Sequence, residues 1–182
     1  MDQLMKGKKG LVMGLANDHS MAYGISKALH ESGAKLAFSY QSDVLLKRIQ
    51  PIIKNWNEDF LLQCDVSSDE SISNLFAEIK KEWGELDFIV HSIAYSDKEE
   101  LRGRYVNTSR GNFLTAMEIS CYSLTAVCRE GYKLMTNGGS IITMSYIGAE
   151  RVMPHYNVMG IAKAALESSV RYLAMDLGEE NI

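Results

Sequence analysis

Short apolar runs alternate along the chain with longer segments whose apolar residues recur every three or four positions. The runs have the length and composition of buried strands. The longer segments have the spacing of amphipathic helices, as Ala22, Ile25 and Leu29 illustrate, and Gly33 marks the end of that helix. This pattern predicts strands at residues 11–14, 35–40, 60–64, 86–91 and 140–145, and helices at residues 21–31, 43–56, 68–83, 109–135 and 156–176.

Regular alternation of strand and helix is typical of a parallel sheet covered by helices on both faces. We therefore expect an α/β fold of the Rossmann type, a doubly wound sheet in a three-layer α/β/α sandwich with right-handed crossovers, formed as one domain by residues 1–182. Pro51 is expected to break or kink the second helix, and residues 92–108 are expected to form a loop. Ligands of such folds bind beyond the carboxyl ends of the strands.

Composition and charge exclude several classes of protein. Of the 182 residues, 46% are apolar and 23% charged, and the formal net charge is -4 without a basic stripe, so nucleic acid is not an expected partner. No apolar stretch is long enough for a signal peptide or a membrane span, and a cytoplasmic location is expected. Cys121 and Cys128 are expected to be buried. The four histidines lack metal-ligand spacing, so no metal site is predicted.

The first strand is followed by a turn suited to an anion. Gly14 permits a tight turn, Ser20 can cap the next helix and donate to a phosphate, and Gly24 is expected to let that helix approach the sheet. The segment is not a G-x-G-x-x-G fingerprint, so taken alone it is equally consistent with an ordinary turn before a capped helix. Its position after strand one nevertheless makes it a candidate for holding a pyrophosphate.

The ends of the second and third strands carry candidates for the adenosine half of a dinucleotide. Gln41 can hydrogen-bond a ribose hydroxyl, Asp65 can accept the adenine amino group and Val66 can pack on the ring. No arginine stands at the end of strand two for a 2′-phosphate, although Lys47 and Arg48 lie one or two turns further on. NADH is therefore expected as the cofactor, with NADPH less favoured. A surface loop residue and a helix cap are the alternative readings of Gln41 and Asp65.

The fifth strand and the last helix carry the candidate chemistry. Tyr156 and Lys163 are seven residues apart, which on a helix places them on one face two turns apart. An ammonium beside a phenol of ordinary pKa ~10 stabilises the negative charge that develops when the phenol donates to a substrate oxygen. In an arbitrary helix the same pair would more often be an interfacial aromatic and a lysine that extends to solvent. Ser145 and His155 form no hydrolase motif.

These residues together resemble the bacterial enoyl-acyl-carrier-protein reductases of type II fatty acid synthesis, within the short-chain dehydrogenase superfamily. The resemblance covers nearly the whole chain and is most specific from Ser145 to Gly160, since the family spaces its Tyr and Lys by seven where most of the superfamily uses four. It implies reduction of trans-2-enoyl thioesters with NADH, an acyl carrier protein as partner, a homotetramer and a cytoplasmic location. By the same resemblance the cofactor residues are Gly14, Ser20, Met21, Gln41, Asp65, Val66, Ile93 and Lys163, the catalytic residues are Tyr146, Tyr156 and Lys163, and the substrate-binding residues are Ser96, Tyr146, Tyr156 and Met159.

The sequence departs from the family pattern in two places. Ala94 stands where many members have glycine, which is expected to narrow the space beside the nicotinamide and affect inhibitor binding. The family also continues beyond Ile182 into a further strand, a helical lid and a last strand, so the fold is expected to be incomplete there, with an open sheet edge and doubtful activity. Two alternatives remain: another carbonyl reductase of the superfamily, and a non-catalytic NAD-binding module.

Overall fold

The computed structural model of the chain describes residues 3–58 and 60–182. Its centre is one five-stranded sheet in the order β3-β2-β1-β4-β5, and every neighbouring pair is parallel. The predicted α/β class and parallel sheet are confirmed. The strands are β1 (Lys9–Met13), β2 (Lys35–Tyr40), β3 (Leu61–Gln63), β4 (Phe88–His91) and β5 (Ser140–Thr143).

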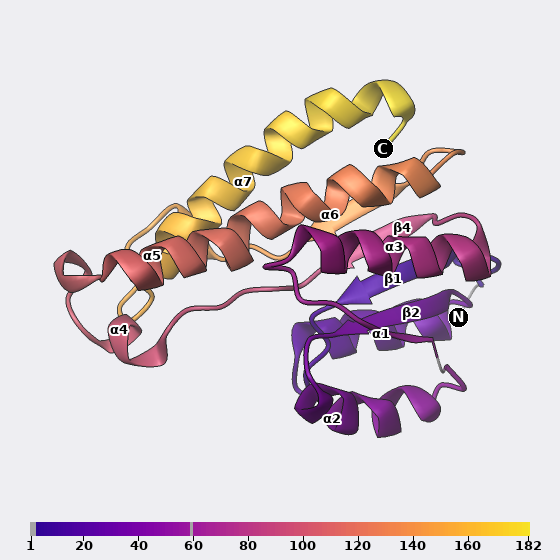
Figure 1. Cartoon of the computed structure of the whole chain (residues 1–182), viewed down its shortest axis with the longest axis horizontal. Coiled ribbons are helices and arrows are strands. Elements are labelled where there is room, and N and C mark those ends of the chain that lie inside the picture. Colours follow the sequence, from indigo (N-terminus) through magenta and orange to yellow (C-terminus); the bar gives the residue numbers. More distant parts are fainter. Residues whose placement is uncertain (1–2, 59) are drawn as a thin grey trace.

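Helices cover both faces of the sheet, as the doubly wound prediction requires (Figure 1). Helices α1 and α2 pack on one face, α3 and α6 pack on the other, and α7 lies beside α6. The helices are α1 (Met21–Glu31), α2 (Asp43–Lys54), α3 (Asp69–Trp83), α4 (Lys98–Arg102), α5 (Arg110–Met117), α6 (Ser123–Gly131) and α7 (Val158–Leu177).

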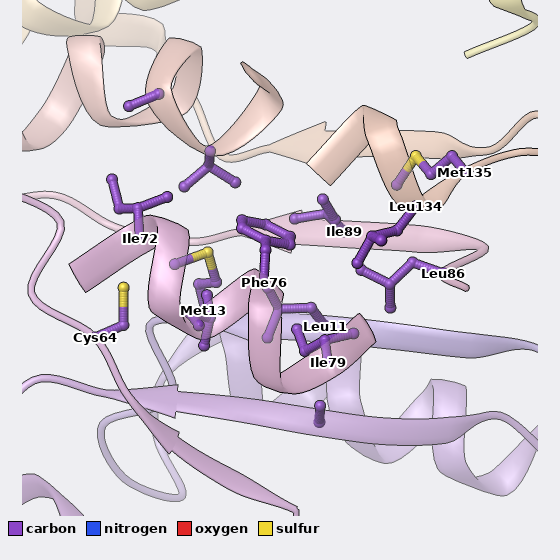
Figure 2. Close-up of a cluster of buried hydrophobic side chains, with 14 residues drawn as sticks. Leu11, Met13, Cys64, Ile72, Phe76, Ile79, Leu86, Ile89, Leu134 and Met135 are labelled. Atoms are coloured by element: carbon purple, nitrogen blue, oxygen red, sulfur yellow. The ribbon is translucent and has the colours of Figure 1, made fainter. Parts of the chain in front are cut away.

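The core explains why these segments fold in this way. Each central strand is buried on both faces, so β1 and β4 are apolar at successive positions instead of alternating. On the α3 face, Phe76 and Ile79 pack with Leu11 and Met13 of β1 and with Ile89 of β4 (Figure 2). Full burial of one such side chain contributes about 1.5–3 kcal/mol to folding. The cluster holds the carboxyl ends of β1 and β4 in fixed relative positions.

The middle of the chain differs from the prediction in three places. Helix α2 continues through Pro51, and because Pro51 and Lys47 are both exposed, water can bind the carbonyl that loses its partner. The predicted helix at residues 109–135 is present, but a π-helical turn at Glu118–Tyr122 separates α5 from α6. The predicted loop at residues 92–108 contains α4 and a 3₁₀ turn at Tyr105–Asn107.

The first helix confirms one local prediction and contradicts another. Ser20 caps α1 by accepting a hydrogen bond from the backbone N–H of Tyr23, as expected. Gly24 does not bring α1 close to the sheet, because a side-chain carbon placed there would have nothing within 4 Å. Gly24 lies on the exposed face of the helix, one residue beyond the half-buried Tyr23 and two beyond the buried Ala22.

Candidate active site

Gly14 forms the turn that ends β1, and the structure shows why no other residue fits. Its φ is 93°, a left-handed conformation that L-residues rarely adopt, and a Cβ at this position would collide with the carbonyl oxygen of Ser92. The backbone of Ser92 in turn donates to the carbonyl of Met13 at 3.0 Å. The absence of a side chain therefore lets the ends of β1 and β4 come together beneath an open surface.

A cavity of about 510 Å³, the Gly14 cavity, opens at this point. It collects five of the residues predicted to bind a cofactor, from four separate strand ends: Gly14, Gln41, Asp65, Val66 and Ile93. Gln41 donates to Asp65 at 3.3 Å. Hydrogen bonds from the backbone and hydroxyl of Ser67 lower the pKa of Asp65, so this carboxylate is ionised and oriented in the cavity wall.

A second cavity of about 360 Å³, the Tyr156 cavity, contains the predicted chemistry. Met21, Tyr146, Tyr156 and Lys163 line it. It shares Ser92, Ile93 and Ala94 with the Gly14 cavity, so the two cavities adjoin along this segment; together they are called the crevice. The crevice follows the carboxyl ends of the parallel strands, where ligands of this fold class bind.

Lys163 is a buried amine at the base of the Tyr156 cavity. Its side chain lies in the first half of α7 and is only 5% exposed. The ammonium donates to the backbone carbonyl of Met144 at 2.6 Å, and burial lowers its pKa. An ammonium has three donors, so Lys163 can hold this carbonyl and still hydrogen-bond a ligand hydroxyl in the cavity.

Tyr156 is not on the same helical face as Lys163, contrary to the prediction. Helix α7 begins at Val158, and Tyr156 lies in the preceding turn between His155 at φ 60° and Asn157 at φ 38°. The two side chains nevertheless line the same cavity. The expectation that both side chains face one cavity agrees with the structure, while the expected helical geometry is wrong.

Close backbone packing places the two tyrosines. A Cβ on Gly148 would lie 2.5 Å from the ring of Tyr156, and one on Gly160 would lie 2.7 Å from the carbonyl oxygen of Gly148. Both glycines thus allow the start of α7 to press against the turn that follows β5. The rings of Tyr146 and Tyr156 then meet edge to face, with centroids 4.8 Å apart.

The pKa of Tyr156 moves in the direction opposite to the expected one. Burial, followed by the neighbouring Tyr146, raises it, and Lys163 is not among the groups that shift it. Tyr156 is therefore a protonated phenol at neutral pH, which is the form that can donate a hydrogen bond to an oxygen.

The remaining predicted residues are less closely grouped. Ser96 and Met159 line a third cavity of about 540 Å³, the Ser96 cavity, and Ala94 borders all three cavities. The Ser96 hydroxyl donates to Asn112 at 3.1 Å. Ser20 lines none of the three cavities; its hydroxyl donates to the carbonyl of Asn17 at 2.7 Å while it caps α1.

The buried histidine and cysteines have structural surroundings. His91 is fully buried, with its ring nitrogens 3.1 Å from Thr143 and 2.8 Å from Ser123, and burial lowers its pKa to about 4. Cys121 and Cys128 are buried, as predicted. Among the described residues no group of three or more His, Cys, Asp or Glu side chains could hold a metal ion.

One further surface lies outside the crevice. An apolar groove of about 560 Å³ runs between β5 and α7 and includes none of the predicted site residues. Within residues 3–58 and 60–182, no helix combines the length and the apolar character needed to cross a bilayer.

Sequence reasoning missed the residues that support the site. Ser120, in the π-helical turn, accepts from the backbone N–H of Tyr95 at 2.9 Å and contacts its carbonyl at 3.1 Å. The Asn112 side chain accepts from the backbone N–H of Asp97, and the Asn157 amide donates to the carbonyl of Glu100. Both hydrogen bonds hold the segment around α4. These are polar residues within helices or at their ends, and the only signal in the sequence is that Ser120 and Asn112 occupy positions where apolar residues would suit a buried face.

Comparison with known proteins agrees with this geometry. Residues 14–182 match the family model described as enoyl-(acyl carrier protein) reductase. The chain is 53% identical to the NADH-dependent enoyl-acyl-carrier-protein reductase FabI of Rickettsia bellii, over 98% of this chain and 68% of that protein.

Solved structures give the same result. The reductase of Anaplasma phagocytophilum in complex with NAD is 55% identical, with a TM-score of 0.97 over 99% of this chain and 69% of that one. The Bacillus cereus reductase with NADP+ and indole naphthyridinone is 47% identical, with a TM-score of 0.97 over 100% of this chain and 71% of that one.

Proposed function

The chain belongs to the family of enoyl-acyl-carrier-protein reductases, and we propose that it uses NADH to reduce the trans-2 double bond of enoyl thioesters carried by acyl carrier protein. The observation that carries the proposal is the crevice in which the Gly14 cavity and the Tyr156 cavity adjoin at Ser92, Ile93 and Ala94. The Tyr156 cavity contributes a phenol and an ammonium, and the Gly14 cavity contributes an ionised carboxylate.

The residues present fit the cofactor. Gly14 lines its cavity without a side chain, and the N-terminus of α1, where free N–H groups favour a pyrophosphate, follows in the same loop. Asp65 and Val66 would hold the adenine and Gln41 the adenosine ribose, and Ile93 and Lys163 would hold the nicotinamide half. Met21 lies at the catalytic end, and Ser20 supports the pyrophosphate through the cap of α1.

NADH is favoured over NADPH by the wall of the Gly14 cavity. The residues that line it include no arginine or lysine to pair with a 2′-phosphate. Asp65 is ionised and would repel such a phosphate, because hydrogen bonds lower its pKa.

Each residue of the Tyr156 cavity has a distinct part in the mechanism. When bound, NADH would supply a hydride to the β-carbon of the enoyl thioester, and a proton taken up at the α-carbon would complete the saturated product. Tyr156 then donates a hydrogen bond to the thioester oxygen as negative charge develops there, and its raised pKa keeps it in the donor form. Lys163 stabilises the same charge and holds the ribose, and Tyr146 orients the substrate against the Tyr156 ring.

The Ser96 cavity is proposed to receive the acyl chain. It adjoins the other two cavities through Ala94, and its wall contains Met159 and Leu101 beside the polar Ser96.

We also propose one dinucleotide-binding domain in residues 1–182, a cytoplasmic location and a homotetramer. Exposed apolar side chains on α5 and α7, such as Leu114, Tyr172 and Met175, support association with further copies. Light scattering after size exclusion tests the tetramer.

The test of the reaction is NADH oxidation by the purified protein with crotonyl and longer enoyl thioesters, on coenzyme A and on acyl carrier protein. Loss of NADH absorbance that depends on the enoyl thioester supports the proposal. Tight NADH binding without turnover would indicate a non-catalytic NAD-binding module, and turnover of ketones alone would indicate a carbonyl reductase.

A further inference from the structure

Asn157 stands at the residue before α7 but does not cap that helix. An asparagine in this place normally accepts a hydrogen bond from the first turn of its own helix. Here no such bond forms, and the side-chain nitrogen lies 3.0 Å from the carbonyl of Glu100, 3.2 Å from that of Leu101 and 2.9 Å from that of Gly103. The amide therefore serves another element, the C-terminal end of α4.

Helix α4 depends on contacts of this kind. It has five residues, too few to be stable without tertiary support, and the carbonyls of its last turn have no partner within the helix. The two N–H groups of the Asn157 amide serve three of these carbonyls, so at least one hydrogen is shared.

The other contacts of α4 lead into the Ser96 cavity. The Glu100 carboxylate accepts from the backbone and hydroxyl of Ser109 at 2.9 and 2.7 Å, and from the Asn112 amide at 3.2 Å. The Asn112 carbonyl oxygen accepts from Ser96 and from the backbone of Asp97. The segment that walls the proposed acyl site is thus tied to α5 at one end and to Asn157 at the other.

Apolar packing joins the same elements to the tyrosine. Leu101 of α4 and Tyr156 both pack against the buried cluster that contains Val158 and Met159. Helix α4 and the Tyr156 side chain are therefore coupled through this shared cluster.

The backbone of Asn157 is strained in a way that matters for Tyr156. Its φ of 38° and ψ of -120° lie outside the regions that L-residues favour. In a helical conformation this residue would extend α7 back through Tyr156, the geometry that the sequence predicts, and would turn the ring away from its present direction. The hydrogen bonds to α4 oppose that change.

We propose that Asn157 is the positioning residue for Tyr156: by holding the end of α4 with its amide, it keeps the tyrosine out of α7 and directed into the crevice. Within the part of the chain that the structure describes, no hydrogen bond joins Asn157 to a residue that lines the Gly14 cavity. Its effect therefore falls on the chemical step and not on the adenosine half of the cofactor. The kinetic part of this inference rests on the proposed function.

Two variants separate the amide from the backbone. Asn157→Gly keeps a residue that accepts positive φ but removes the amide. Asn157→Asp keeps size and shape but removes both N–H donors. The matched control is Asn57→Gly, which changes an exposed asparagine with φ 58° outside all the cavities.

The expected result is a fall of at least tenfold in kcat for both Asn157 variants, with NADH affinity changed less than twofold and Asn57→Gly unchanged. Misplacement of a reacting group by about 1 Å can cost ~100-fold in rate. If Asn157 acts through Tyr156, adding Asn157→Asp to Tyr156→Phe should slow the enzyme no further. Additive losses in that double variant, or full kcat in Asn157→Gly, would overturn the proposal.

A second readout does not need turnover. Tyrosine-labelled NMR titration should show the raised pKa of the Tyr156 phenol falling toward the ordinary value in both Asn157 variants, as the ring leaves its half-buried place. An unchanged titration in both would refute the positioning role. A wild-type protein that fails to oxidise NADH would count against the proposed function, while the titration still decides the role of Asn157.

Discussion

Replacement of Gly14 by alanine tests the turn on which the crevice depends. The new side chain would have to adopt φ 93° and would collide with the Ser92 carbonyl at the junction of β1 and β4. A left-handed conformation costs an L-residue about 1–2 kcal/mol, and overpacking in a rigid interior adds about 1–3 kcal/mol. We expect a loss of about 2–5 kcal/mol in the free energy of unfolding.

Gly24→Ala is the matched control. Gly24 lies inside α1 with an ordinary φ, and a Cβ there meets nothing within 4 Å. Alanine in an exposed helix interior is about 0.5–1 kcal/mol more favourable than glycine, so this variant should gain stability. The same chemical change should therefore have opposite effects at two positions ten residues apart.

Differential scanning fluorimetry and NADH titration measure the outcome. For a domain of this size 1 kcal/mol shifts Tm by about 2–4 °C, so Gly14→Ala should lower Tm by roughly 4–20 °C and Gly24→Ala should raise it by roughly 1–4 °C. NADH affinity should fall only in Gly14→Ala. A Gly14→Ala protein with wild-type Tm and NADH affinity would refute the account of the turn.

Three other changes follow from the site. Tyr156→Phe should lower kcat by about 10²–10³-fold, the usual loss of one donor to an oxyanion, with little effect on NADH binding; equal turnover would remove Tyr156 from this role. Lys163→Met should weaken NADH binding and rate together, by about tenfold or more for a lost charged hydrogen bond, and unchanged cofactor affinity would contradict contact with the ribose. In the folded state the pKa of His91 is lowered from 6.5 to about 4, so folding favours the neutral ring. This preference contributes about 3 kcal/mol to the free energy of unfolding above pH 6.5, and the contribution is lost as the pH falls toward 4. Urea unfolding should show the free energy of unfolding falling between pH 7 and 4, and His91→Gln should reduce that fall. An equal fall in the variant and the wild type would show that His91 is not its source.

Much of the fold follows from local pattern. The apolar strands and the amphipathic helices between them predict a parallel sheet, and the carboxyl-end rule then brings Gly14, Gln41, Asp65 and Ile93 to one crevice. The prediction succeeds because Gly14 and Gln41 directly follow a strand, and Asp65 and Ile93 lie one residue further along. Strand order alone therefore determines their places.

The supporting contacts could not be predicted in the same way. Helical periodicity placed Tyr156 on α7, but tertiary hydrogen bonds to α4 hold Asn157 in a conformation that its local sequence does not favour. Gly24 shows the converse error, because a glycine near a phosphate turn suggests close packing that only neighbouring atoms can establish. The π-helical turn at Glu118–Tyr122 likewise depends on the contacts of Ser120 with Tyr95, which lies 25 residues away along the chain.

The most direct test of the central claim is a crystal structure of the protein with NAD. The crevice account predicts adenine beside Asp65 and Val66, the pyrophosphate at Gly14, and the nicotinamide ribose within hydrogen-bonding distance of the Lys163 ammonium, with the Tyr156 phenol facing the nicotinamide ring. Electron density for NAD at any other surface, or a nicotinamide out of reach of both Tyr156 and Lys163, would contradict it.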